Sequence, residues 1–65
     1  MKSGWLVRKD YCGDLTMFEV YRLIDANKPD DETNREKYES YASHETAIFN
    51  AKRLNKRAAE RYWKY

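Results

Sequence analysis

The stretch SHETAIFNAKRLNKRAAERYWKY, residues 43–65, decides the fold because it has the apolar repeat of one long amphipathic helix. Its small and apolar side chains recur every three or four residues and predict a stripe that packs on the rest of the chain, made of Ala47, Ala51, Leu54, Ala58 and Tyr62. Ser43 is placed to cap the helix, because its hydroxyl can accept a hydrogen bond from a free amide of the first turn. We therefore predict a helix over about residues 44–63.

The residues before this helix are typical of three short strands. Segments 4–9, 15–24 and 37–42 are rich in β-branched and aromatic side chains. Gly13 separates the first two segments and predicts a tight hairpin turn. The sequence therefore predicts one small α+β domain over residues 1–65, in which a three-stranded antiparallel meander packs against a single C-terminal helix.

The second segment has apolar side chains on both of its faces. Alternation places Phe18, Val20 and Ile24 on one face and Glu19, Tyr21 and Leu23 on the other. This pattern indicates either a central strand or a bulge that switches the register near Tyr21. In the third segment, alternation places Tyr38 and Tyr41 on opposite faces.

Residues 25–36 are polar, contain Pro29 and show no periodicity, so they predict a long loop without apolar anchors. The loop contains several side chains with hard oxygen atoms, but their spacing departs from the calcium-loop pattern. We therefore expect no calcium site here. Because residues 26–35 lack apolar anchors, we expect them to be the least ordered internal segment, and the sequence leaves open whether the loop is ordered.

Size and composition exclude several classes of site. A single cysteine, Cys12, allows no internal disulfide and favours a reducing compartment. Cys12 and the only histidine, His44, are too few for a structural zinc site, and nothing in the sequence brings them together as a catalytic pair. No apolar stretch is long enough to span a membrane. We expect no enzyme activity, no cofactor, no metal, no membrane association and a cytoplasmic location.

Charge is unevenly distributed although the net charge is only +2. Residues 25–39 contain six acids and three bases, whereas residues 52–64 contain six bases and one acid. The side of the predicted helix opposite the apolar stripe combines cations with aromatic rings: Phe49, Lys52, Arg53, Lys56 and Trp63. Cations attract phosphates and aromatic rings stack on bases, so these five residues form a candidate partner or nucleic-acid surface.

Two functions fit these features. The chain contains ten aromatic residues, which is more than so small a core can enclose, and Tyr and Trp are enriched at protein interfaces. We favour a small regulatory or binding module that acts through protein–protein interaction, with an unknown protein partner or as a homodimer. The alternative is a nucleic-acid-binding domain that uses the outer face of the helix.

Three segments carry a resemblance to known proteins. They are Val20-Tyr21-Arg22-Leu23, Asn34-Arg35-Glu36, and the stretch from Ser43-x-Glu45-x-Ala47 to Leu54-Asn55. Together they resemble short uncharacterised bacterial proteins of β-β-β-α type, over about residues 5–58. The resemblance implies this fold and a bacterial source, and it implies no activity. The architecture is also similar to the sheet-plus-helix DNA-binding domains at the N-termini of some integrases, which is an analogy of fold alone.

Overall fold

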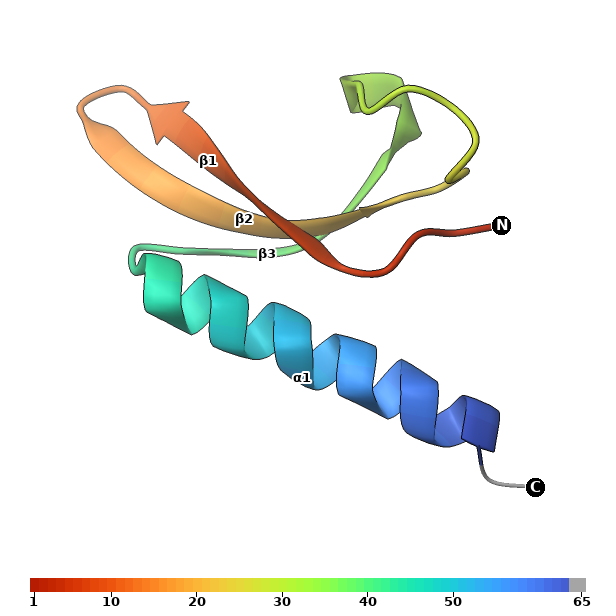
Figure 1. The fold of residues 1–65 in the computed structure, drawn as a ribbon. Coiled ribbons are helices and arrows are strands. Elements are labelled where there is room, and N and C mark those ends of the chain that lie inside the picture. The colour runs from red at the N-terminus through yellow and green to blue at the C-terminus, as the bar shows by residue number, and fades with distance from the viewer. Residues whose placement is uncertain (64–65) are drawn as a thin grey trace.

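The computed structural model contains the three strands and the helix that the sequence predicts. It describes the backbone of residues 1–63 and the side chains of residues 1–58. The elements are β1 (Leu6–Cys12), β2 (Leu15–Leu23), a short 3-10 helix η1 (Glu32–Asn34), β3 (Arg35–Tyr41) and α1 (His44–Trp63). The sheet has the order β1-β2-β3 with both pairs antiparallel, and α1 lies across one face (Figure 1). The predicted α+β fold is confirmed.

The β1–β2 hairpin is longer than predicted at the end of β1. Only Gly13 and Asp14 form its turn, and Gly13 has a φ of +64°. Glycine adopts such a φ without a steric penalty, and this kind of two-residue turn matches the natural twist of paired strands. Pairing therefore continues to Cys12, opposite Leu15, instead of ending near residue 9.

β2 is the central strand, and the irregularity near Tyr21 lies in its neighbour β3. Val20 pairs with Glu39 but Tyr21 pairs with Lys37, so Tyr38 is an extra residue without a partner. This bulge shifts the alternation of β3. The Tyr38 ring contacts Trp5, with ring centroids 5.6 Å apart, and Tyr41 packs against the core. The prediction that Tyr38 and Tyr41 occupy opposite faces is therefore wrong, because a bulge resets a period of two.

The core between the sheet and α1 is very small. Its fully enclosed part consists of Val20, Ala47 and Ala51, with partly buried side chains packed around it: Trp5, Val7, Phe18, Tyr41 and Leu54. Figure 1 shows why: the hairpin end of the sheet and the 25–34 loop both curve away from the helix, so α1 covers only the middle of the sheet. Ala58 is exposed, which ends the predicted stripe at Leu54. Tyr62, the last member of that stripe, lies outside the described side chains.

Polar side chains fix α1 at its N-terminus and, farther along, at Asn55. The amide of Thr46 donates to Ser43 Oγ at 3.4 Å, so Ser43 caps the helix as predicted. Farther along, the Asn55 carboxamide accepts from the Trp5 amide at 2.7 Å and donates to the Trp5 carbonyl at 3.1 Å. Asn55 therefore attaches the helix to the chain just before β1 through two backbone hydrogen bonds.

The 25–34 loop has a polar anchor in place of the apolar one that it lacks. The side chain of Asn34 is only 6% exposed and bonds the loop from inside. Its Oδ1 accepts from the Asp25 amide at 2.9 Å, and its Nδ2 donates to the carbonyls of Asp25, Lys28 and Pro29. Because one side chain ties together four backbone groups, the loop has a defined shape.

Candidate functional site

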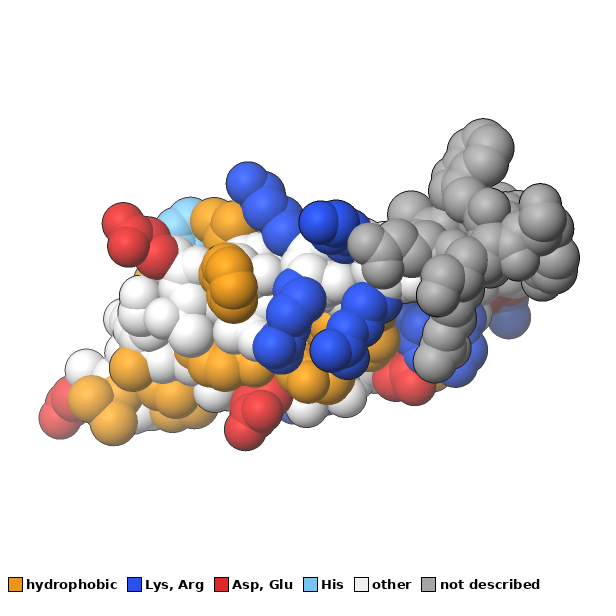
Figure 2. Space-filling model, turned by 90° about the horizontal axis from the view of Figure 1, so that it is seen from below, with side chains coloured by type: hydrophobic (Ala, Val, Ile, Leu, Met, Phe, Trp, Pro, Cys, Tyr) orange, Lys and Arg blue, Asp and Glu red, His pale blue; other side chains and the backbone are white. Residues whose placement is uncertain are grey.

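The outer face of α1 carries four of the five residues that the sequence assigns to a partner surface. Phe49, Lys52, Arg53 and Lys56 line one shallow groove of about 390 Å³, and we call these four residues the basic helix surface. In a view from the helix side, Lys and Arg side chains gather over α1 beside exposed hydrophobic ones (Figure 2). The fifth predicted residue, Trp63, lies outside the described side chains.

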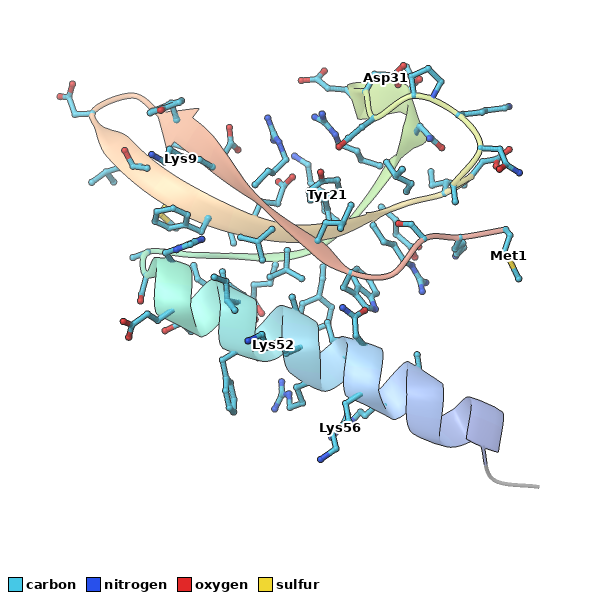
Figure 3. The ribbon with its side chains drawn as sticks, viewed as in Figure 1. Met1, Lys9, Tyr21, Asp31, Lys52 and Lys56 are labelled. Atoms are coloured by element: carbon cyan, nitrogen blue, oxygen red, sulfur yellow. The ribbon has the colours of Figure 1, made fainter. Side chains whose placement is uncertain are left out.

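Helical geometry explains why these residues meet. Positions 49, 52, 53 and 56 are three or four residues apart, so their side chains lie on one side of the helix, away from Ala47 and Ala51. Phe49 is 65% exposed, a large fraction for a phenylalanine. Lys56 points away from the sheet (Figure 3). The basic helix surface therefore combines one exposed apolar ring with three cations.

The two layers of the molecule differ in how their charges are balanced. Residues 1–43 contain seven bases and nine acids, and residues 44–58 contain four bases and one acid, Glu45. All ion pairs among the described side chains lie in the sheet and its loops. On α1, Arg53 donates to the neutral Asn50 at 2.8 Å. Two of the acids of residues 25–39, Asp30 and Glu36, form ion pairs within the sheet layer. The surplus positive charge lies on the helix.

The sheet face opposite α1 has a buried carboxylate at its centre. Glu19 is 2% exposed, and its two oxygens lie 3.4 Å from Arg8 Nη1 and 3.3 Å from Lys37 Nζ. Arg8 and Lys37 also line a polar hollow of about 240 Å³ together with Glu32 and Arg35. The three cations of this hollow are balanced by Glu19, Asp30 and Glu32, so the hollow has no net charge with which to attract an ionic partner.

A second polar cluster joins this face to the 25–34 loop. Tyr21, on the side of the sheet away from α1 (Figure 3), donates its hydroxyl to Asp30 at 2.6 Å, and Arg35 Nε donates to the same carboxylate at 2.6 Å. Burial and the hydrogen bond to Asp30 raise the pKa of Tyr21. The hydrogen bonds from Tyr21 and Arg35 lower the pKa of Asp30. Asp30 is therefore ionised, and its two carboxylate oxygens accept the hydrogen bonds that hold the loop to the sheet.

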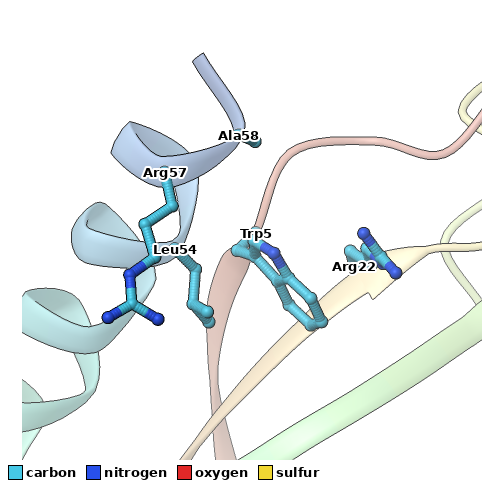
Figure 4. Close-up of a pocket in the computed structure, with 5 residues that line it drawn as sticks. All are labelled: Trp5, Arg22, Leu54, Arg57 and Ala58. Carbon is cyan, nitrogen blue, oxygen red and sulfur yellow. The ribbon is translucent and has the colours of Figure 1, made fainter. Parts of the chain in front are cut away.

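A third surface feature is a pocket at the start of β1 (Figure 4). Trp5, Arg22, Leu54, Arg57 and Ala58 line a space of about 250 Å³. The Arg22 guanidinium lies 4.4 Å from the centre of the Trp5 ring, and its Nε donates to Glu36 at 2.6 Å. The pKa of Glu36 is lowered to about 2, chiefly by this hydrogen bond and then by Lys2. These contacts hold Trp5 in place against the core, which is a structural role.

The two residues with conventional catalytic side chains lie on different sides of the sheet. Cys12 is exposed at the hairpin end of β1, on the face opposite α1. His44 begins α1 and packs against Phe18, with ring centroids 5.0 Å apart and the rings tilted by 44°. Among the described residues, no three His, Cys, Asp or Glu side chains are grouped so as to hold a metal ion. No helix in the described part of the chain is long and apolar enough to cross a membrane.

Sequence reasoning identified the basic helix surface but not the buried carboxylate of Glu19. Alternation placed Glu19 on the face opposite Val20, and the structure shows that this is the face away from α1, where a charged side chain is normally exposed. The sequence does contain two cations, Arg8 and Lys37, that could have indicated the buried carboxylate. They become neighbours of Glu19 only when the register of the strands is known. The chain matches no protein-family model, and neither the curated proteins nor the solved structures contain a match.

Proposed function

We propose that this protein is a small non-catalytic binding module that acts through protein–protein interaction, and that the basic helix surface is its contact site. The observation that supports the proposal is the exposed ring of Phe49 among Lys52, Arg53 and Lys56 in one groove. Apolar anchors surrounded by polar groups are the usual centre of protein interfaces. We place the protein in the cytoplasm because its single thiol, Cys12, is free and exposed.

The chemistry of the surface indicates the kind of partner. Surplus positive charge on α1 attracts an acidic segment and orients its approach. Phe49 then offers a place for an apolar side chain of that segment. We therefore propose a partner segment in which acidic residues flank a bulky apolar one. The small core gives the same surface a second role, because a partner that binds only the folded state stabilises it.

Selection of peptides from a random display library on the immobilised protein tests this proposal. We expect the enriched peptides to combine acidic residues with a bulky apolar residue. Phe49→Ser and Lys56→Glu should each weaken their binding at least tenfold. Lys28→Glu makes the same change of charge in an exposed part of the 25–34 loop, so it serves as the matched control and should have little effect. Equal losses for Lys28→Glu and Lys56→Glu would contradict the proposal.

Nucleic-acid binding by the same surface is the second candidate. It is favoured by the combination of three cations with an exposed aromatic ring, because phosphates and a stacked base need both. Titration with a fluorescent single-stranded oligonucleotide at low salt tests it. Binding must weaken steeply as salt rises and must be lost in Lys52→Glu combined with Lys56→Glu. No binding of single-stranded DNA or RNA at low salt would eliminate this candidate.

A further inference from the structure

The two edges of the sheet are not equally protected against pairing with another strand. β3 carries the bulge at Tyr38, and bulges disrupt the ladder that a further strand would need. β1 pairs with β2 in an unbroken register from Leu6 to Cys12 and forms the other edge. The edge of β1 is therefore the one that retains a regular row of backbone groups.

The backbone groups that face this edge belong to Val7, Lys9 and Tyr11. In a two-residue hairpin, the closing pair, here Cys12 and Leu15, is hydrogen-bonded across the turn, and hydrogen-bonded and non-bonded pairs then alternate along the strands. The odd-numbered residues of β1 therefore point their amides and carbonyls outward. Trp5 agrees with this assignment, because Asn55 bonds both its amide and its carbonyl. Asn55 caps the edge at Trp5 and leaves three residues available.

We propose that a second copy of this chain pairs with this edge, so that two β1 strands run antiparallel about a twofold axis at Lys9. Outward-facing residues must pair with one another, so the symmetric registers are centred on Arg8, Lys9 or Asp10. Each of these centres places one charged residue opposite its own copy, and like charges directly opposite are destabilising. A centre at Arg8 or at Asp10 has no pair of opposite charges to offset this repulsion. A centre at Lys9 places Arg8 opposite Asp10 of the other copy, twice. The charges on β1 therefore select the register at Lys9.

The same register gives Tyr11 a binding site. Tyr11 is 71% exposed. In the dimer it lies opposite Val7 of the other copy, on the face that carries α1. There, Val7 and Lys9 line a hollow of about 280 Å³ together with Phe18 and His44. Tyr11 of each copy would lie beside this hollow in the other copy. The pairing of Tyr11 with Val7 would stabilise the two neighbouring strands, as aromatic and β-branched pairs do.

The resulting dimer has one continuous six-stranded sheet with both helices on the same face. It carries two copies of the basic helix surface side by side, although the inference does not depend on the function of that surface. The only unfavourable pair is Lys9 with its own copy at the twofold axis. That repulsion limits the strength of the dimer and makes Lys9 the most informative position to change.

Disulfide cross-linking at Lys9 tests the register directly. In a Cys12→Ser background, Lys9→Cys places two thiols on opposite residues, whose Cα atoms in a hydrogen-bonded antiparallel pair are about 5.5 Å apart. Disulfides form over Cα separations of roughly 4.4–6.8 Å. We expect rapid formation of a covalent dimer on mild oxidation. Asp14→Cys in the same background has an equally exposed thiol at the hairpin turn and controls for random collision. Equal rates for the two variants would overturn the proposal.

Sedimentation equilibrium of three further variants separates this edge from other surfaces. The apparent mass of the wild type should approach twice the monomer mass at millimolar concentration. Lys9→Pro removes an amide that β2 does not use and should give a monomer that keeps its fold. Asp10→Lys keeps every backbone bond but replaces two attractions with repulsions, and should also be monomeric. Lys9→Leu should dimerise more tightly than the wild type. A wild type that stays monomeric, or variants that all behave like it, would refute the pairing.

Discussion

Asn34 is the residue whose replacement tests our description of the fold most sharply, because one buried amide holds the whole 25–34 loop. Truncation to Ala removes the acceptor for the Asp25 amide at 2.9 Å and the donor to the Asp25 and Pro29 carbonyls at 2.9 and 3.0 Å. The contact to the Lys28 carbonyl is longer, at 3.3 Å, and shares a donor with these two. Three good hydrogen bonds are therefore lost.

The expected cost follows from the net value of such bonds. Each contributes about 1 kcal/mol, so Asn34→Ala should lower the free energy of unfolding by about 3 kcal/mol. A hydrophobic core in a domain of this size supplies only about 3–5 kcal/mol in total. The variant should therefore be close to its unfolding midpoint in the absence of denaturant.

Urea unfolding followed by circular dichroism measures this loss, and amide exchange shows whether the loop opens first. Asn27→Ala is the matched control, because Asn27 is exposed in the same loop and only its backbone amide is hydrogen-bonded, to Asp25. We expect the control to change stability by less than about 0.5 kcal/mol, as is usual for surface positions. If Asn34→Ala were as mild as Asn27→Ala, the loop would not depend on Asn34 and our reasoning would be wrong.

Three further changes test other parts of the structure. Glu36 has a pKa of about 2, below its unfolded value, because Arg22 and then Lys2 donate hydrogen bonds to its carboxylate. Its contribution to the stability of the folded state is present above the unfolded pKa and is lost as the pH falls toward 2. The melting temperature of Glu36→Gln should therefore fall less between pH 5 and pH 2 than that of the wild type. An equal fall in the two proteins would contradict this prediction. Leu54→Ala should cost about 2 kcal/mol in urea unfolding, the low end for a core leucine because Leu54 is only partly buried; no measurable cost would place Leu54 outside the core. Gly13→Ala should lower the free energy of unfolding by about 1–2 kcal/mol, because a residue with a Cβ disfavours the φ of +64° at this position. The cost comes from the backbone alone, since no atom lies within 4 Å of the added Cβ. An unaffected urea midpoint would mean that the turn rearranges freely.

The parts of the fold that the sequence predicts well are those governed by a repeating pattern. The spacing of Ala47, Ala51 and Leu54 fixes the helix face, and alternation around Val20 fixes the two faces of β2. These signals extend over several turns or pairs, so a local exception does not hide them. The basic helix surface was found for the same reason, since its residues follow the spacing of the helix.

The features that the sequence did not reveal depend on single contacts between distant residues. Asn34 is one polar residue in a polar loop, and Asn55 bonds Trp5 fifty positions earlier in the chain. Tyr38 becomes the extra residue of a bulge only when β2 and β3 pair. Ala58 continues the apolar spacing of α1, but the sheet curves away before reaching it. No periodicity encodes these contacts, because each depends on the three-dimensional arrangement.

We propose that partners bind to the outer face of α1. The most direct measurement is a titration of the ¹⁵N-labelled protein with the acidic peptide obtained from display selection, followed by amide chemical shifts. We expect the largest shifts at Phe49, Lys52, Arg53 and Lys56, with small changes on the sheet face that carries Glu19. Shifts centred on Glu19 and its neighbours, with the amides of the basic helix surface unmoved, would contradict the claim.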